Sequence, residues 1–203
     1  MLNNKNIRNI SIIAHVDHGK STLADRFMEF SGLIKPGDHE DQILDNMDLE
    51  RERGITIKSR PIRLQFDDLT INLIDTPGHV DFSYEVSRAL IACDGAILLV
   101  DGTQGVQAQT FAHSYAAIDS GLDLIPVINK IDSVDVDVKN VSNQIHNLIG
   151  STDDEIFKIS SKTGEGVKEL IQALPSLINP PKEETEKVNA LIFDSYFDSY
   201  RGV

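Results

Sequence analysis

Short apolar runs recur along the chain, and amphipathic segments separate them. Four of these runs have the length and composition of buried strands, and a weaker fifth run follows near residue 155. The segment 56–66 instead alternates apolar and polar residues, and its Pro61 favours an edge position in a sheet. The expected strands are 9–14, 56–66, 71–75, 95–101, 124–129 and 155–160.

Between these runs, apolar residues recur at three- and four-residue spacing, which predicts helices. Strands that alternate with helices favour right-handed crossovers and a mostly parallel, six-stranded sheet with helices on both faces. The pattern therefore predicts an α/β fold whose ligands bind at the carboxyl ends of the strands. The expected helices are 20–30, 83–92, 106–118, 137–149 and 164–177.

Two regions depart from this pattern. The stretch 31–55 is long, polar and charged, and loops of this length in compact domains are usually functional. Residues 179–187, NPPKEETEK, have the composition of a linker, and an apolar and aromatic segment follows them. We therefore expect a main domain over 1–180, a linker over 181–187 and the first strand of a truncated β-barrel domain over 188–203.

The charge balance narrows the choice of partners. The chain carries 32 acidic and 19 basic residues, a formal net charge of −13. Such a surface repels nucleic-acid backbones, so we expect no DNA partner and only local contacts with RNA. Cys93 is the only cysteine, which agrees with a reducing compartment. We expect a cytoplasmic monomer.

Residues 14–22, AHVDHGKST, fit the phosphate-binding loop G-x-x-x-x-G-K-[ST] except at Ala14. Loop N–H groups and a helix N-terminus surround phosphate oxygens in such loops, Lys20 neutralises phosphate charge, and Ser21 gives its hydroxyl to Mg²⁺. Alanine at position 14 is costly only if its φ is positive. The expected nucleotide contacts are Ala14, His15, Val16, Asp17, His18, Gly19, Lys20, Ser21 and Thr22.

Other interpretations of this stretch stay open. A strand, a turn and a helix without a ligand would show the same pattern. His15 and His18 also form an H-x-x-H pair, although a zinc site needs further ligands.

Two motifs suit the metal and the γ-phosphate. DTPGH begins at Asp75, whose carboxylate can hold Mg²⁺ through water, while Gly78 can offer its N–H to the γ-phosphate. His79 is placed to orient an attacking water. Thr56, in RGIT, can give a hydroxyl to Mg²⁺ while a γ-phosphate is present. Read separately, these motifs are also compatible with an ordinary turn and a loop-to-strand junction.

Two further motifs suit a guanine base. The Asp132 carboxylate, in NKID, can accept hydrogen bonds from N1–H and the 2-amino group, which adenine cannot donate. The alkyl stem of Lys130 can lie over the base, and Asn129 can tie this loop to the phosphate loop. Backbone N–H groups of SSK can meet the guanine O6. The residues expected at the base are Asn129, Lys130, Ile131, Asp132, Ser160, Ser161 and Lys162.

The five motifs occur in chain order at strand ends or beside the long loop, which favours a guanine-nucleotide site over chance matches. We predict hydrolysis of GTP to GDP, with Lys20 and loop N–H groups stabilising charge and His79 orienting the water. Ser21, Thr56 and Asp75 are the predicted Mg²⁺ residues. A GTP-binding regulatory module without turnover and a P-loop ATPase remain as alternatives.

AHVDHGKST, ERERGIT, DTPGHVDF and NKID together resemble the translational GTPases, and ALIFDSYFDSYRGV is most similar to the elongation factor 4, or LepA, type. The resemblance implies a ribosome-dependent GTPase of elongation, with proposed back-translocation activity. It also implies a hydrophobic gate formed by Val16 and Ile55, and further domains that carry most RNA contacts. Membrane association occurs in some members, and elongation factor G or BipA types remain as alternatives.

Overall fold

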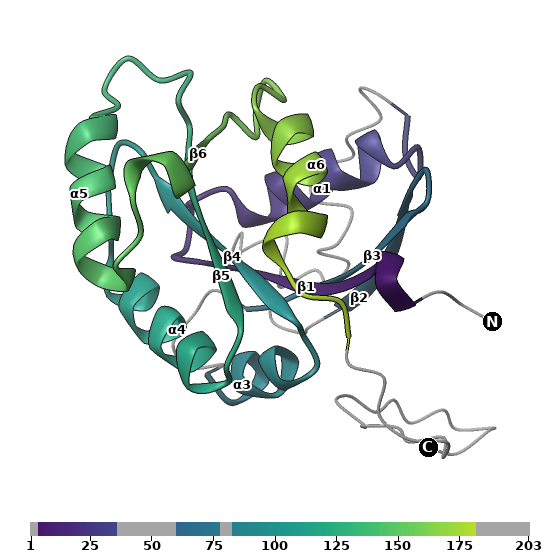
Figure 1. Cartoon of the computed structure of the whole chain (residues 1–203). Coiled ribbons are helices and arrows are strands. Elements are labelled where there is room, and N and C mark those ends of the chain that lie inside the picture. Colours follow the sequence, from purple (N-terminus) through teal and green to yellow (C-terminus); the bar gives the residue numbers. More distant parts are fainter. Residues whose placement is uncertain (1–3, 36–59, 78–82, 182–203) are drawn as a thin grey trace, which may run out of the picture.

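A computed structural model of the chain describes residues 4–35, 60–77 and 83–181. A six-stranded sheet crosses the molecule in the order β2-β3-β1-β4-β5-β6 (Figure 1). Its strands are β1 (Ile7–Ala14), β2 (Arg60–Phe66), β3 (Leu69–Asp75), β4 (Gly95–Asp101), β5 (Asp123–Asn129) and β6 (Phe157–Lys158).

The pairing confirms a mostly parallel sheet. β1 pairs in parallel with β3 and with β4, and β5 pairs in parallel with β4 and with β6. Only β2 is antiparallel, to β3, and it is an edge strand, as Pro61 predicted. Because the carboxyl ends of the parallel strands share one edge, the loops that follow them are brought together.

Helices cover both faces of the sheet (Figure 1). One face carries α1 and α6, whose apolar side chains form a core cluster with the sheet. The other face carries α3, α4 and α5 around a second cluster. Their bounds are α1 (Lys20–Phe30), α3 (Ser83–Ile91), α4 (Ala108–Asp119), α5 (Val138–Ile149) and α6 (Val167–Leu177).

Strand β4 shows why the apolar runs lack alternation. Successive side chains of a strand point to opposite faces. Ile97 and Leu99 pack in the cluster with α1 and α6, while Leu98 and Val100 pack in the cluster with α3, α4 and α5. All seven residues of β4 are buried because both faces are covered.

Local polar chemistry sets the bounds of several elements. At the start of α5, the Asp137 carboxylate accepts a hydrogen bond from the Asn140 N–H, 3.0 Å away. Gly150 ends the same helix at φ 75°, a conformation that glycine adopts without a Cβ penalty. These caps explain why α5 ends at Ile149, as predicted.

The sequence overestimated the last strand. β6 has only two residues, and a 3₁₀ turn, Asp153–Glu155, occupies the first position of the predicted strand 155–160. The Thr152 and Glu155 side chains cap this turn reciprocally, which favours the turn over an extended chain.

Some predictions concern residues outside the described part of the chain. They include the segment 188–203, nearly all of the linker 181–187 and most of the loop 31–55. Within the described ranges, no helix combines the length and the apolar character needed to span a bilayer.

Candidate functional site

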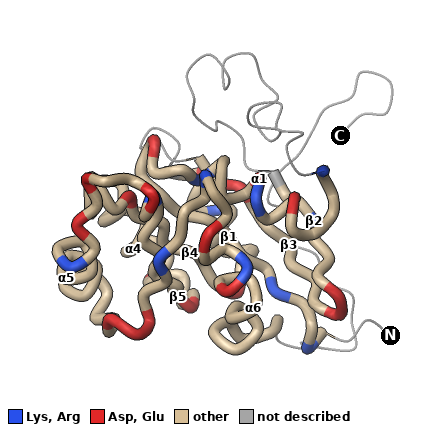
Figure 2. The backbone as a smooth tube through the Cα atoms, turned by 90° about the horizontal axis from the view of Figure 1, so that it is seen from above, with Lys and Arg blue, Asp and Glu red and all other residues tan. Residues whose placement is uncertain are grey.

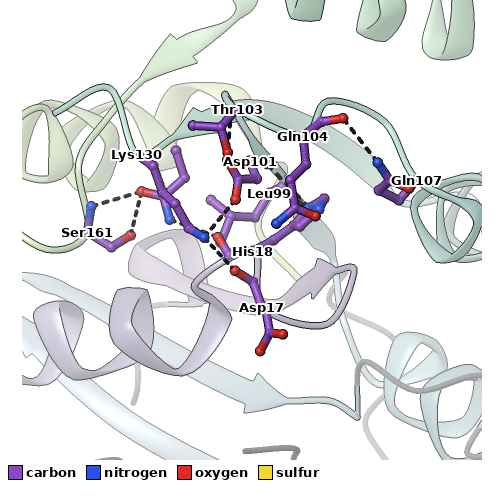
Figure 3. A network of polar contacts seen from close by, with 10 residues as sticks. Asp17, His18, Leu99, Asp101, Thr103, Gln104, Gln107, Lys130 and Ser161 are labelled. Carbon is purple, nitrogen blue, oxygen red and sulfur yellow. Dashed lines mark hydrogen bonds and ion pairs between the residues drawn. The ribbon is translucent and has the colours of Figure 1, made fainter. Parts of the chain in front are cut away.

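The loops that follow β1, β3, β4, β5 and β6 meet at the carboxyl edge of the sheet. Figure 3 shows residues from the β1, β4, β5 and β6 parts of this edge converging on one polar network. Residues more than a hundred positions apart in sequence, such as His18 and Asn129, are in direct contact there. The edge of the sheet, and no single loop, therefore builds the site.

Ala14 fits the phosphate loop without strain. It is the last residue of β1, and the non-glycine residues with positive φ in the described chain are Asp17, Asp67 and Lys130. Gly19 differs, because it caps α1 at φ 93° and an added Cβ would collide with the Asn129 side-chain amide. The turn thus requires glycine at position 19 and tolerates alanine at position 14.

Lys20 and Asp75 form a buried ion pair. The side chains are only 8% and 1% exposed, and the Lys20 ammonium contacts Asp75 Oδ1. The sequence placed both residues at the phosphates and the metal without predicting this pairing. Two paired opposite charges offset each other's burial cost. The carboxylate of Asp75 and the hydroxyl of Ser21, the residue after Lys20, are oxygen donors of the kind that Mg²⁺ prefers, so the chemistry of these donors fits that ion.

Asn129 connects three segments. Its Nδ2 donates to the His18 carbonyl at 2.9 Å, which ties the loop after β5 to the phosphate loop as predicted. Its Oδ1 accepts from the Ser161 backbone N–H at 2.9 Å and from the Ser161 hydroxyl at 3.0 Å. Because Asn129 is almost fully buried, each of these bonds satisfies a group that water does not reach.

Lys130 is held on the outer side of this network (Figure 3). Its ammonium donates to the Asp17 carbonyl at 2.7 Å and lies 2.6 Å from Asp101 Oδ2. The other oxygen of Asp101 accepts from the Thr103 N–H and hydroxyl, both at 2.7 Å. Burial alone would raise the pKa of Asp101, but the hydrogen bonds from Lys130 and Thr103 outweigh burial and lower it. Asp101 is therefore an anionic anchor, which the sequence analysis missed.

His18, within the phosphate loop, has a fully buried side chain. Its Nδ1 lies 3.3 Å from the backbone N of Asp101 and 3.4 Å from the Leu99 carbonyl oxygen. Burial lowers the pKa of His18 to about 4, so the imidazole is neutral near pH 7. A neutral ring with its proton on Nε2 can accept the Asp101 N–H at Nδ1.

The alternative metal interpretation of His15 and His18 gains no support. Their ring centroids lie 5.2 Å apart and the rings are tilted by 59°. Across the three described stretches, no group of three or more His, Cys, Asp or Glu residues is arranged to hold a metal ion. Among the residues that the structure describes, the pair therefore has no additional ligands of the kind that zinc needs.

Asp132 lines a cavity of about 240 Å³. The Ser160 hydroxyl donates to Asp132 Oδ1 at 2.6 Å, and this bond is the main reason why the pKa of Asp132 is lowered. The carboxylate is thus held in its charged, accepting form. The cavity is lined by Gly19, Thr22, Asn129, Lys130, Asp132, Ser133, Ser161 and Lys162.

Two interactions near the cavity have no counterpart in the motifs. Arg26 of α1 donates from Nε to the Ser161 carbonyl at 2.9 Å. Gln109 of α4 accepts a hydrogen bond from the Val16 N–H, 3.4 Å away. Neither residue belongs to a short pattern, and only the folded chain brings them to the loops.

Several predicted residues cannot be placed. Thr56, Gly78 and His79 lie outside the described residues, as does Ile55 of the predicted gate. Their roles at the metal, the γ-phosphate and the attacking water stay predictions.

Comparisons with known proteins show the family of the chain. Residues 5–180 match the family model of the elongation factor Tu GTP-binding domain. The chain is 56% identical over 203 residues to elongation factor 4 of Chlorobium chlorochromatii, covering 97% of this chain and 34% of that protein. It is 54% identical to the chloroplastic translation factor GUF1 homolog of Physcomitrium patens, covering 98% of this chain and 28% of that protein. The chain thus spans about a third of the length of the relatives it matches.

Solved structures share the fold. The bacterial selenocysteine-specific elongation factor EF-Sec superposes with a TM-score of 0.65 at 28% identity, over 84% of this chain and 28% of that one. A protein from Thermus thermophilus superposes with a TM-score of 0.70 at 18% identity, over 87% and 41% of the two chains. With the family model matching most of its length, the chain belongs to the family of elongation factor Tu GTP-binding domains.

Proposed function

We propose that this protein binds GTP and hydrolyses it to GDP and phosphate, as a conformational switch in translation elongation. The observation that carries the proposal is the buried connection from the His18 carbonyl through Asn129 to Ser161. This connection fixes a phosphate loop and a base-binding loop on either side of one cavity. A ligand with a purine and a chain of phosphates matches both loops.

Guanine selection is assigned to Asp132. Its charged carboxylate, held by Ser160, would accept from N1–H and the 2-amino group of the base. The backbone N–H groups of Ser160 and Ser161 donate within the protein, to Glu165 and Asn129, so the Lys162 N–H is our candidate donor for O6. The Lys130 stem would cover one face of the base.

The phosphates and their metal are assigned to the Lys20 end of the site. On binding, Lys20 would exchange Asp75 for phosphate oxygens, and Asp75 would hold Mg²⁺ through water, together with the hydroxyls of Ser21 and Thr56. When bound, Mg²⁺ neutralises charge on the transferred phosphoryl group. Lys20 and the loop N–H groups stabilise the same charge from the protein side.

We assign to His79 the role of orienting the attacking water, and to Gly78 a contact with the γ-phosphate. Val16 and Ile55 would shield the water from His79 until activation. The γ-phosphate would order the loops around Thr56 and Gly78, and hydrolysis would release them. Without a stimulating partner, turnover should be slow, on the order of 10⁻⁴ to 10⁻² per second.

The stimulating partner is proposed to be the ribosome, as the names of the elongation factor 4 relatives suggest. Acidic and basic positions are interspersed over the described chain (Figure 2), so a positively charged face for RNA is not the basis of the proposal. The relatives are about three times as long, and their further parts are our candidates for RNA contact. We assign the protein to the cytoplasm as a monomer, and leave back-translocation as the proposed outcome of the cycle.

The test is GTP hydrolysis by the full-length protein, measured with and without ribosomes. We expect strong stimulation by ribosomes and loss of that stimulation in His79→Ala. Unchanged stimulated hydrolysis in His79→Ala would remove the role assigned to His79. GTP binding that promotes assembly without any turnover would favour the regulatory alternative, and displacement of GDP by ATP as readily as by GTP would exclude the guanine assignment.

A further inference from the structure

Arg26 lies on α1, about one helical turn beyond the phosphate loop 14–22, and reaches the loop 160–162. Its side chain is four-fifths buried, at 19% exposed. Its Nε donates to the Ser161 carbonyl at 2.9 Å and its Nη2 donates to the Lys162 carbonyl. Its Nη1 pairs with Glu29 one turn along the helix. Every nitrogen of the guanidinium therefore has an acceptor.

These contacts hold the loop 160–162 from the side facing α1. From the other side, Asn129 accepts hydrogen bonds from the Ser161 N–H and hydroxyl. Both backbone polar groups of Ser161 are thus engaged, the N–H by Asn129 and the carbonyl by Arg26. A loop fixed on both sides presents its next amide, that of Lys162, and its Ser160 hydroxyl in one geometry.

Arg26 does not line the 240 Å³ cavity, whereas Ser161, Lys162 and Asp132 do. We propose that Arg26 is a positioning residue for base selection, which acts on the nucleotide only through the loop 160–162. Because Arg26 and Lys20 share one helix, this contact also joins the phosphate half of the site to the base half. The inference rests on the proposed guanine-nucleotide function and deepens it.

The chemistry of the contact calls for arginine. A guanidinium is a planar fork whose N–H groups can reach two successive carbonyls at once, whereas an ammonium is a single point of charge. Replacement by lysine keeps the charge and removes the fork. Lys168 offers a matched control, because it is an exposed cation on α6, the helix that follows the same loop.

The experiment compares the dissociation constants of GDP and ADP for the whole protein and for Arg26→Ala, Arg26→Lys and Lys168→Ala, by calorimetry or displacement of fluorescent GDP. ADP carries the same phosphates but lacks the groups that Asp132 and the Lys162 amide would recognise. We expect Arg26→Ala to weaken GDP about tenfold, the scale of lost charge-assisted hydrogen bonds, and to leave ADP unchanged. Arg26→Lys should show most of the same weakening of GDP binding. Lys168→Ala should have the same dissociation constants as the unaltered protein.

The outcomes separate clearly. A GDP-to-ADP preference that falls in both Arg26 variants, with kcat at saturating GTP unchanged, supports the proposal. Equal weakening of GDP and ADP, or full recovery in Arg26→Lys, overturns it. If the unaltered protein shows no preference for GDP, the proposed function fails; a normal preference that Arg26→Ala leaves intact removes this inference alone.

Discussion

The two edges of the sheet differ in how their polar groups are connected. The amino edge has the larger cavity, about 480 Å³ against about 240 Å³ at the carboxyl edge. Seven of its eleven lining residues are apolar, among them Leu122, Leu124, Ile125 and Pro126. The polar side chains at the carboxyl edge instead form one buried network that crosses from loop to loop. A ligand site is therefore indicated here by connected polar groups, and cavity size alone would mislead.

The largest effect is expected from Lys20→Ala, which removes the cation of the buried ion pair at the carboxyl edge. Asp75 would remain as a buried charge without its lysine, at a cost of roughly 3 kcal/mol in the free energy of unfolding. GTP affinity should fall by about 10²-fold or more because phosphate charge loses its partner. Chemical denaturation without nucleotide and calorimetric GTP titration measure the two effects. A Lys20→Met/Asp75→Leu variant should recover most of the stability and none of the binding.

Asp132→Asn should alter base choice while leaving the fold intact, because Asp132 is exposed. An asparagine can accept from N1–H but cannot accept from a 2-amino group with its amide nitrogen. We expect GDP affinity to fall by roughly 10²-fold and xanthosine diphosphate, which has a 2-oxo group, to become the better ligand. Competition binding measures the ratio, and a variant that still prefers GDP would contradict the assignment.

The pH dependence of stability should report on His18. Its pKa is lowered to about 4 in the fold, while the unfolded chain has an ordinary histidine pKa near 6.5. Below pH 6.5 the imidazole binds a proton in the unfolded state but not in the folded state. The contribution of His18 to the free energy of unfolding is therefore fully present well above pH 6.5 and is lost as the pH falls towards 4. Between pH 7 and pH 5 the protonation of this residue alone should lower the free energy of unfolding by about 2 kcal/mol.

The matched variant is His18→Asn, whose side-chain oxygen can accept from the Asp101 N–H in place of Nδ1. Denaturation midpoints at several pH values give the slope for each protein. The unaltered protein should lose about 2 kcal/mol more than the variant over this interval. Parallel slopes would show that His18 does not titrate as its burial implies.

The smallest effects test the comparison of the two edges most directly. Ser161→Ala removes a hydrogen bond to Asn129 at the carboxyl edge. We expect the free energy of unfolding to fall by about 1 kcal/mol and GDP to be released faster. Ser151 lines the amino-edge cavity, and its buried hydroxyl has no hydrogen-bond partner among the described residues. Ser151→Ala should therefore leave GDP release unchanged and stability equal or slightly higher. Equal effects of the two changes would remove the distinction between the edges.

Much of the fold followed from residue patterns with a fixed period. β4 and α1 have the predicted bounds because a continuous apolar run and a three- and four-residue spacing each fit one element. The start of β6 was predicted wrongly because the side chains of Thr152 and Glu155 cap a 3₁₀ turn there, which apolar content does not reveal. Pattern predicts an element well where burial decides it, and poorly where a few polar groups do.

The site was predictable only as far as its motifs reach. The tie from Asn129 to the phosphate loop was expected from the sequence, but the second bond from Asn129 to Ser161 was not. The roles of Arg26 and Asp101 were not predicted, because their partners are backbone groups or side chains that only the folded sheet brings near them. The burial of His18 was also hidden, since a polar residue within a motif is expected to face the ligand.

The contact between Asn179 and the first residue of β5 has a mechanical consequence. Asn179 donates twice to the Asp123 carboxylate, at 3.1 and 3.0 Å, which fastens the outgoing segment at the first residue of β5. Asn129, at the other end of the same strand, touches the nucleotide loops. Seven residues of extended chain make this strand about 23 Å long. The strand therefore separates the Asn179 contact at Asp123 from the loop contacts of Asn129. The segment that leaves α6 is therefore fastened at the end of β5 that lies far from the phosphate loop.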